Sequence, residues 1–298
     1  MLFIVVIIDS TFICSKSLKL LLNIKCKLTV KYAVIPTLNI NAIINSIFLE
    51  HTRELGETLE AIAEDKSHVI TGEQKCVYVA EQTQGVLTII QNQAQKLKVP
   101  LKIYGKDFYA DQIRYTKDGM LFDVIINGQT YPDITVPLLG EHQAKNCALA
   151  LALCKDVLKE FDLNKVKKNL SQINWPGRME VISKNPFILL DACINEASCE
   201  NVLKVLEHLD IKDASVIVGI PDDKDYAGVV RNMKKVASTL ILTKSANPHY
   251  VFTRRQQERL EAEGICTEWT ESVSEAMDLA VKKVKPIVIL GTTSVIAE

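Results

Sequence analysis

The sequence lacks the cysteine and histidine spacings that mark zinc or redox centres. Its eight cysteines form no Cys-x-x-Cys pair, and no group of cysteines and histidines has zinc-ligand spacing. We therefore expect no zinc, and reduced, mostly buried thiols as in cytoplasmic proteins. An excess of one charge is also missing, because 35 basic and 36 acidic side chains leave a net charge of −1. This balance gives no general attraction to nucleic acid or to an anionic membrane.

The N-terminal region lacks an apolar run long enough to span a bilayer. Residues 2–8 are apolar but too few for a membrane helix, and no positive charge precedes them as in a secretory signal. A buried strand is the favoured interpretation, and a signal or anchor is the alternative. The composition, 48% apolar and 24% charged, is typical of a soluble globular protein, and 298 residues suffice for two domains.

Glycine is missing from the start of the chain, where the first one is Gly56. No Gly-x-x-x-x-Gly-Lys-[Ser/Thr] string occurs anywhere in the sequence. The backbone N–H groups of such a loop hold phosphates, and its lysine reaches the transferred group. We therefore expect no phosphate loop of this type in the chain. We interpret residues 1–40 as a divergent N-terminal segment or as sequence attached to a truncated gene.

The most informative stretch runs from residue 175 to residue 206. It opens with Trp175-Pro-Gly-Arg178, a turn because proline and glycine break a helix. A short polar run follows, and then residues 186–190 form an apolar segment of buried-strand length. A loop of small residues leads from there into an amphipathic helix.

Asp191 stands where this predicted strand ends. A carboxylate at the carboxyl end of a buried strand, facing a loop and a helix start, lies where open α/β sheets bind nucleotides. The alternative is that Asp191 only caps the following helix. The local pattern leaves both roles open.

Three more apolar runs follow, at residues 214–219, 239–243 and 286–291, and each ends in a polar loop. The first of these loops contains Lys224 between two aspartates. Continuous apolar runs are typical of parallel strands covered by helices on both faces. Residues 175–298 are therefore predicted to form a small doubly wound domain.

Residues 41–174 are predicted to form a partial central domain with a mixed sheet. An apolar strand is expected over residues 41–51, a helix over residues 83–97, and antiparallel strands on either side of an Asn127-Gly128 hairpin turn. A further helix is expected over residues 148–158.

Five motifs resemble, in order, the folylpolyglutamate synthase/dihydrofolate synthase branch of the Mur ligase family. They are Leu55-Gly-Glu-Thr58, Ile62-Ala-Glu-Asp-Lys66, Leu138-Leu-Gly-Glu-His142-Gln-Ala-Lys-Asn146, Trp175-Pro-Gly-Arg178 and Asp191-Ala-Cys-Ile-Asn195. The resemblance covers about residues 39–298. It implies an α/β protein with the remnant of a central ATPase domain followed by a Rossmann-like C-terminal domain. The family has a histidine where this chain has Ile194, and a proline where it has Glu196.

The resemblance also assigns roles to individual residues. His51 and a carbamylated Lys66 are expected to bind magnesium. One straight helix from His51 to Lys66 would separate them by about 22 Å, so they could share a metal only if the chain turns, and we expect that turn at Gly56. The catalytic set is expected to be Lys66, Arg178 and Lys224, whose charges suit phosphate and a substrate carboxylate. Contacts with the nucleotide are expected from His142, Gln143, Asn146, Arg178, Asp191 and Asn195. The alternatives are that His51 caps a strand end, that Lys66 is a solvated surface side chain, and that the polar groups before residue 148 cap a helix.

The implied activity is an ATP-dependent carboxylate–amine ligase that adds glutamate to a folate through an acyl phosphate. ATP and Mg²⁺ would be its cofactors, and its partners would be ATP, a folate-like acid and glutamate, without nucleic acid or membrane. We expect a cytoplasmic monomer. Without a phosphate loop the alternative is a non-catalytic paralogue or remnant that binds nucleotide or substrate, and we predict no ligase activity for this polypeptide alone. A Mur-type peptidoglycan ligase is a further alternative.

Overall fold

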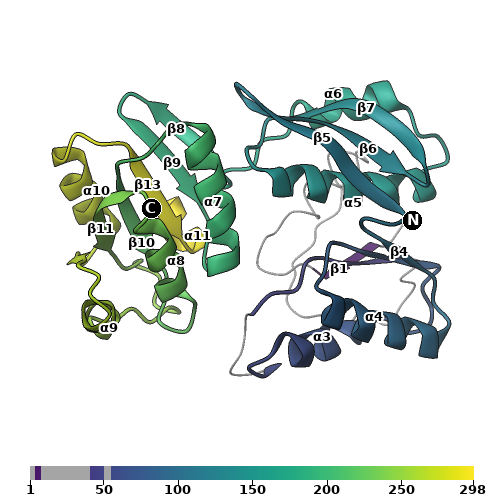
Figure 1. Ribbon diagram of the computed structural model, residues 1–298, viewed down its shortest axis with the longest axis horizontal. Coiled ribbons are helices and arrows are strands. Elements are labelled where there is room, and N and C mark those ends of the chain that lie inside the picture. Colours follow the sequence, from purple (N-terminus) through teal and green to yellow (C-terminus); the bar gives the residue numbers. More distant parts are fainter. Residues whose placement is uncertain (1–3, 8–40, 50–54) are drawn as a thin grey trace. The chain divides into compact units, whose positions relative to one another are not determined.

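The computed structural model describes residues 4–7, 41–49 and 55–298. These residues form two compact units, shown in Figure 1. The first unit takes in the described residues up to Thr116, together with Met120–Pro137 and Glu141–Ile173. The second unit contains Asn174–Glu298, together with the short segments Lys117–Gly119 and Leu138–Gly140. Each unit is described by itself below.

The first unit is built on a parallel sheet with the strand order β1-β2-β3-β4. The strands are β1 (Ile4–Ile7), β2 (Asn41–Ile44), β3 (Cys76–Val79) and β4 (Leu101–Ile103). Alternate residues of the middle strands, such as Ala42 and Ile44 on β2, pack against helices α3 (Leu59–Ser67) and α4 (Gln84–Leu97). This period of two is the ordinary consequence of strand geometry. Strand β1 lies where the sequence predicts a strand.

The segment after β2 differs from the prediction. A strand was expected through residue 51, but β2 ends at Ile44 and residues 45–49 have no regular structure. The Gln82 side chain binds this segment at two points, accepting from the Ile47 N–H (3.0 Å) and donating to the Asn45 carbonyl (2.7 Å). A side-chain amide therefore takes the hydrogen bonds that a neighbouring strand would otherwise satisfy.

The predicted turn at Gly56 is confirmed. Gly56 has a φ of +104°, a conformation that favours glycine, and α3 begins at Leu59. The Thr58 hydroxyl caps this helix by accepting from the Ala61 N–H at 3.2 Å. Lys66 lies in the last turn of the same helix.

An antiparallel sheet completes the first unit. Its strands are β5 (Phe108–Thr116), β6 (Gly119–Ile126) and β7 (Gln129–Val136), in that order. The hairpin between β6 and β7 is confirmed, because Asn127 and Gly128 both have positive φ. Helix α5 (Glu141–Val157) packs against β5, and α6 (Leu163–Leu170) packs against β7. Helix α5 begins seven residues earlier than predicted.

The second unit contains a six-stranded sheet with the order β12-β11-β10-β13-β9-β8. The strands are β8 (Glu180–Lys184), β9 (Phe187–Asp191), β10 (Ala214–Gly219), β11 (Ala237–Leu242), β12 (Glu268–Trp269) and β13 (Ile287–Gly291). All neighbouring pairs are parallel except β8 with β9. The predicted polar run before residue 186 is thus an antiparallel edge strand. Its side chains are half-buried or exposed, so the segment has no apolar run to mark it.

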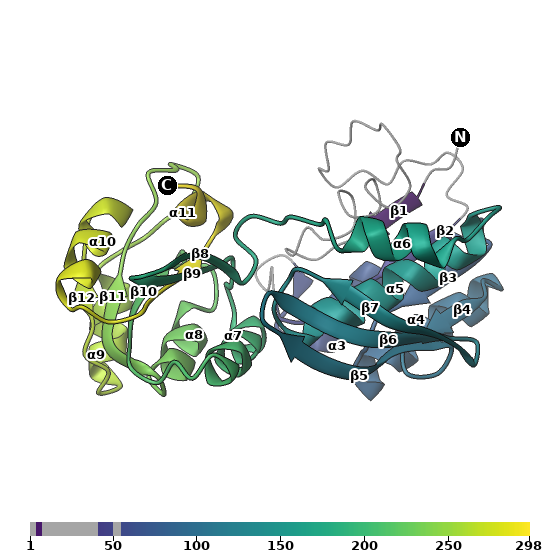
Figure 2. The same ribbon diagram turned by 90° about the horizontal axis from the view of Figure 1, so that it is seen from above.

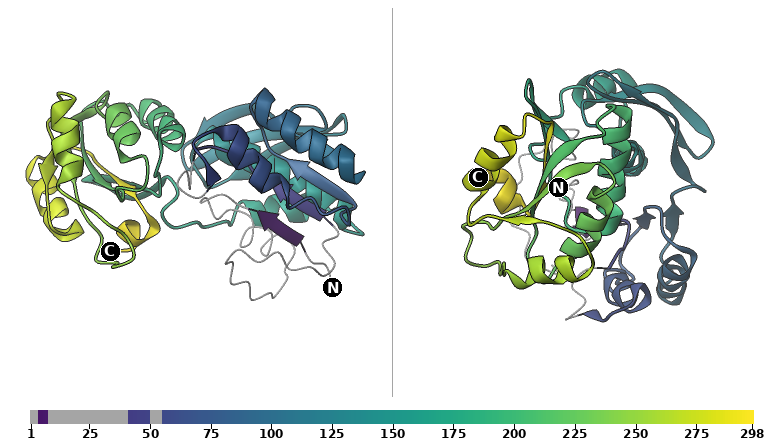
Figure 3. Two further views of the ribbon diagram at one scale, coloured as in Figure 1. Left: turned by 90° about the horizontal axis from the view of Figure 1, so that it is seen from below. Right: turned by 60° about the vertical axis from the view of Figure 1, so that its left-hand side comes forward.

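Helices cover both faces of this sheet, as Figures 2 and 3 show. Helices α7 (Glu196–His208) and α8 (Tyr226–Met233) pack together on one face. Helices α10 (Val273–Lys282) and α11 (Thr293–Ala297) pack on the other, around a core that includes Ile217, Ile241 and Ile289. Helix α9 (Arg255–Ala262) connects β11 to β12. This arrangement confirms the predicted doubly wound α/β fold.

Within the described ranges no helix is both long and apolar enough to cross a membrane.

Candidate functional site

Polar residues gather at one edge of the sheet in the second unit. The carboxyl ends of its parallel strands meet there, as they must in any parallel sheet. Asp191 is the last residue of β9, Lys224 lies in the loop after β10, and Thr243 and Thr292 directly follow β11 and β13. This edge is therefore the part of the second unit where a ligand would be expected.

Arg178 and Asp191 form a buried pair at this edge. Only 7% of Arg178 and 5% of Asp191 is exposed. The Met179 N–H donates to Asp191 Oδ2 at 2.9 Å, and Arg178 Nη1 donates to the Ala192 carbonyl at 3.5 Å. Burial raises the pKa of Asp191 to about 6, although the Arg178 charge and the Met179 N–H act in the opposite direction. Burial also lowers the pKa of Arg178, and the nearby Asp191 partly offsets this effect.

Asn195, not Asp191, caps the helix that follows β9. Asn195 Oδ1 accepts from the Ser198 N–H at 2.8 Å, and Ser198 Oγ accepts from the Asn195 N–H at 3.4 Å. These reciprocal bonds form a capping box. The interpretation of Asp191 as the cap of α7 is therefore wrong. The side-chain oxygen of Asn195 thus already accepts a hydrogen bond within the protein. The expected contact of Asn195 with a nucleotide stays a prediction.

The loop between Asp191 and Asn195 carries no imidazole. Ile194 is half-buried there. Its neighbour Cys193 is fully buried and accepts a hydrogen bond from Ser198 Oγ at 3.3 Å. Burial raises the pKa of the Cys193 thiol well above its ordinary value, so the thiol is neutral and unreactive. The residues that replace the family histidine therefore supply packing rather than charge.

Lys224 lies in a tight loop after β10. Its N–H donates to the Pro221 carbonyl at 3.1 Å. The side chain is 17% exposed, and its ammonium lies 3.8 Å from the Asp223 carboxylate. A partly exposed cation with one loose ion pair remains able to meet an anionic ligand.

The hydroxyls of Thr243 and Thr292 complete this edge, and the sequence analysis gave them no role. Both are buried and lack a hydrogen-bond partner within the described part of the chain. A buried hydroxyl left unpaired costs about 1–3 kcal/mol. Thr243 ends the apolar run at residues 239–243 and Thr292 directly follows the run at residues 286–291, so both stand at a predicted strand end, as Asp191 does.

The first unit holds the other expected nucleotide contacts. His142 and Gln143 lie in the first turn of α5, with 3.0 Å between His142 Nε2 and Gln143 Nε2. Asn146 is half-buried, one turn further along the helix. Gln143 and Asn146 lie three residues apart on this helix, and therefore near one face of it. Gln143 is almost fully buried, and its amide contacts the neighbouring His142 ring.

The expected magnesium ligands are only partly described. Lys66 is half-buried in the last turn of α3, and His51 lies outside the described residues. Across residues 4–7, 41–49 and 55–298, no group of three or more histidine, cysteine or acidic side chains could hold a metal ion. The magnesium assignments to His51 and Lys66 therefore stay predictions.

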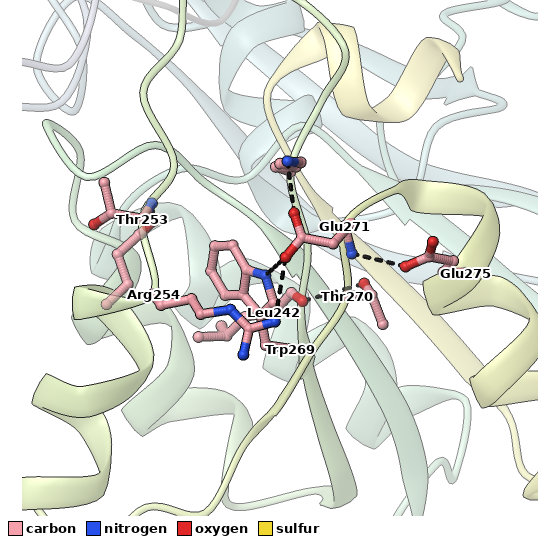
Figure 4. Close-up of polar contacts among 9 residues, drawn as sticks. Leu242, Thr253, Arg254, Trp269, Thr270, Glu271 and Glu275 are labelled. Atoms are coloured by element: carbon pink, nitrogen blue, oxygen red, sulfur yellow. Dashed lines mark hydrogen bonds and ion pairs between the residues drawn. The ribbon is translucent and has the colours of Figure 1, made fainter.

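A separate polar network lies beyond the carboxyl end of β12 (Figure 4). Glu271 accepts from Lys244 at 2.6 Å, from Trp269 Nε1 at 2.8 Å and from Arg254 at 3.3 Å. These hydrogen bonds, that of Lys244 first, lower the pKa of Glu271 to about 2. Half of the Glu271 side chain is exposed, so the network adds little stability. Glu271 forms ion pairs with two cations at this end of the sheet, Lys244 and Arg254.

Two family models match the sequence. The Mur ligase middle domain matches residues 37–154, and the Mur ligase glutamate ligase domain matches residues 177–293. A probable bifunctional folylpolyglutamate synthase/dihydropteroate synthase of Haloferax volcanii is 28% identical over 272 residues, covering 86% of this chain and 31% of that protein. Folylpolyglutamate synthase of Lacticaseibacillus casei is 24% identical over 255 residues, covering 84% of this chain and 59% of that protein.

The fold has a counterpart among solved structures. Folylpolyglutamate synthase of Mycobacterium tuberculosis, complexed with ADP and AMPPCP, matches with a TM-score of 0.77 at 23% identity, over 86% of this chain and 61% of that one. This chain therefore spans about a third to three fifths of the length of the relatives named. Both domain models nevertheless match in family order, and together they span most of the sequence. The protein belongs to the Mur ligase family.

Proposed function

We propose that this protein takes part in the ATP-dependent ligation of glutamate to a folate-like acid, and that this polypeptide alone, without a phosphate-loop string, does not complete the reaction. The support is its family, the folylpolyglutamate synthases among its relatives, and the ADP and AMPPCP bound in the structure of one of them. In this reaction the γ-phosphoryl group of ATP passes to a carboxylate and gives an acyl phosphate and ADP. The amino group of glutamate then attacks the acyl carbon, and phosphate leaves as the amide forms.

The single observation that carries the proposal is the buried Arg178–Asp191 pair at the carboxyl edge of the sheet. Burying charged side chains costs desolvation free energy, and such buried charges are common at sites that bind charged ligands. Arg178 and Lys224 supply positive charge for phosphate or carboxylate, and the hydroxyls of Thr243 and Thr292 can accept and donate hydrogen bonds. Magnesium, with Lys66 and His51 as its proposed ligands, would neutralise phosphate charge during transfer.

The proposal is tested by calorimetric titration with Mg-ATP. The variants are Asn146→Ala in the first unit and Asp191→Asn in the second, and each has a matched control at an exposed position. The controls are Asn164→Ala on α6 and Asp278→Asn on α10. We expect saturable binding that weakens at least about tenfold in each test variant, equivalent to 1.4 kcal/mol, but not in the controls.

Binding that is equal in all five proteins would contradict the proposed contacts. No heat of binding at millimolar ATP would favour the second candidate, a non-catalytic paralogue that binds substrate alone. That candidate is supported by the missing phosphate-loop string and by Ile194 at the position of the family histidine. A Mur-type peptidoglycan ligase is the weaker alternative, because the Trp175-Pro-Gly-Arg178 string favours the folate branch. The cytoplasmic location and the monomeric state stay predictions.

A further inference from the structure

Asp225 joins the N-termini of two helices that are distant in the sequence. It is the N-cap of α8, and its Oδ1 accepts from the Gly228 N–H at 2.9 Å. Its Oδ2 accepts from the N–H of Glu196, the first residue of α7, also at 2.9 Å. One carboxylate therefore satisfies N–H groups at both helix starts, and both helix dipoles favour its negative charge.

The two helices follow strands that are not neighbours in the sheet. Helix α7 follows β9 and α8 follows β10, but β13 lies between these strands. With two strand spacings between them, the strands lie about 10 Å apart. The Asp225 carboxylate therefore bridges the loop after β9 and the loop after β10. The first of these loops begins at Asp191, and the second contains Lys224.

Gly228 gives independent support for this bridge. It is the third residue of α8, and its N–H is the one that donates to Asp225 Oδ1. A Cβ at this position would lie 2.7 Å from Asp225 Oδ1 and 2.8 Å from its Cγ. A Cβ at this position would therefore meet the Asp225 carboxylate where it now lies, and the carboxylate would have to shift.

We propose that Asp225 is a positioning residue, which holds Lys224 beside the Asp191 loop by bridging the starts of α7 and α8. Lys224 is joined to Asp225 by a peptide bond, and Glu196 follows the loop that begins at Asp191. Loss of the bridge removes the hydrogen bond between this loop and the start of α7. The loop then keeps its attachment through β10 and α8 and its hydrogen bonds with Val251 and Gln256. The role in ligation rests on the proposed function, because Lys224 is a proposed cation for phosphate or carboxylate.

The test separates bridging from ordinary helix capping. In Asp225→Ser the hydroxyl can still cap α8, since serine is a good N-cap, but it has no second oxygen for the Glu196 N–H. Gly228→Ala displaces the carboxylate without any change of charge. Asp222→Asn removes an exposed carboxylate from the same loop and serves as the control. Acylation of Lys224 by an N-hydroxysuccinimide ester is followed by mass spectrometry on the full chain, and thermal unfolding is measured in parallel.

We expect Lys224 to be acylated at least about threefold faster in Asp225→Ser and Gly228→Ala, and unchanged in Asp222→Asn. The rate at a remote lysine, Lys285, should not change in any folded variant. If Lys224 is acylated at the same rate in folded wild type and folded Asp225→Ser, then Asp225 acts only as a helix cap. That result would overturn the proposal. A rise in Asp225→Ser without one in Gly228→Ala would be an effect of charge and would also overturn it.

The labelling needs neither nucleotide nor turnover. Its failure would remove the positioning role and leave the ligase proposal standing. Failure of Mg-ATP binding would remove the ligase proposal and leave the labelling result intact. The two ideas are therefore tested separately.

Discussion

Asp191 should make the second unit less stable as pH rises from acidic to neutral. Its ordinary pKa of 3.8 is raised to about 6 by burial in the folded protein. The folded state therefore holds this proton more tightly than the unfolded chain. The free energy of unfolding falls as pH rises from the unfolded pKa through the folded one, and it levels off above both. Asp191→Asn removes this dependence, because an amide does not titrate.

The size of the effect follows from the two pKa values, 3.8 and about 6. Their difference corresponds to about 3 kcal/mol at a pH above both, of which about 2.5 kcal/mol develops between about pH 4 and about pH 7.5. The stability of Asp191→Asn relative to wild type should therefore rise by this amount over that interval. Arg178 is charged throughout the range, so the loss of its partner adds only a constant offset.

Urea unfolding followed by tryptophan fluorescence measures this difference. The chain has two tryptophans, Trp175 and Trp269, and both lie in the second unit, so the signal reports the unit that contains Asp191. Asp278→Asn, an exposed position in the same unit, controls for a change of net charge. A gap between Asp191→Asn and wild type that is independent of pH would refute the reasoning. A gap that moves the other way would mean that the Arg178 charge outweighs burial.

Three further predictions follow from local contacts and from the sequence. Asn195→Ala should destabilise the second unit by about 1 kcal/mol through loss of the capping box, whereas Asn195→Asp should not; equal urea midpoints for the two would argue against the cap. Gly291→Ala should lower the free energy of unfolding by about 1–3 kcal/mol, because its Cβ would overlap the Gly219 carbonyl oxygen; a wild-type melting temperature would disprove this packing. The polypeptide alone should release no ADP in a glutamate-dependent manner, because phosphoryl transfer depends on a phosphate cradle; turnover in that assay would disprove the prediction.

Local sequence was enough for most of the second unit. The apolar runs predicted strands β9, β10, β11 and β13, because a strand buried on both faces must be apolar throughout. Turn chemistry predicted the Asn127-Gly128 hairpin, since few residues adopt positive φ. These features depend on residues that are close in the chain.

The sequence predicted edge strands and helix starts less well. Strand β8 was missed because an edge strand with half-exposed side chains has no apolar run. Helix α5 was started too late, because its first turns carry polar residues that also suit a cap. In both cases the deciding interactions are with β9 and β5, which the local pattern does not contain.

The sequence by itself determined the family, the strands of the second unit and the candidate residues at their ends. Only the tertiary structure decided how deeply those residues are buried and which contacts they make. It buried both Arg178 and Asp191, close enough for their charges to interact, assigned the cap to Asn195, and placed Asp225 against a helix that starts 29 residues earlier. The physical reason is that hydrophobic periodicity and secondary-structure propensity depend on residues within a few positions of one another in the sequence. Burial of charge and strand order depend on neighbours that are brought together only by folding.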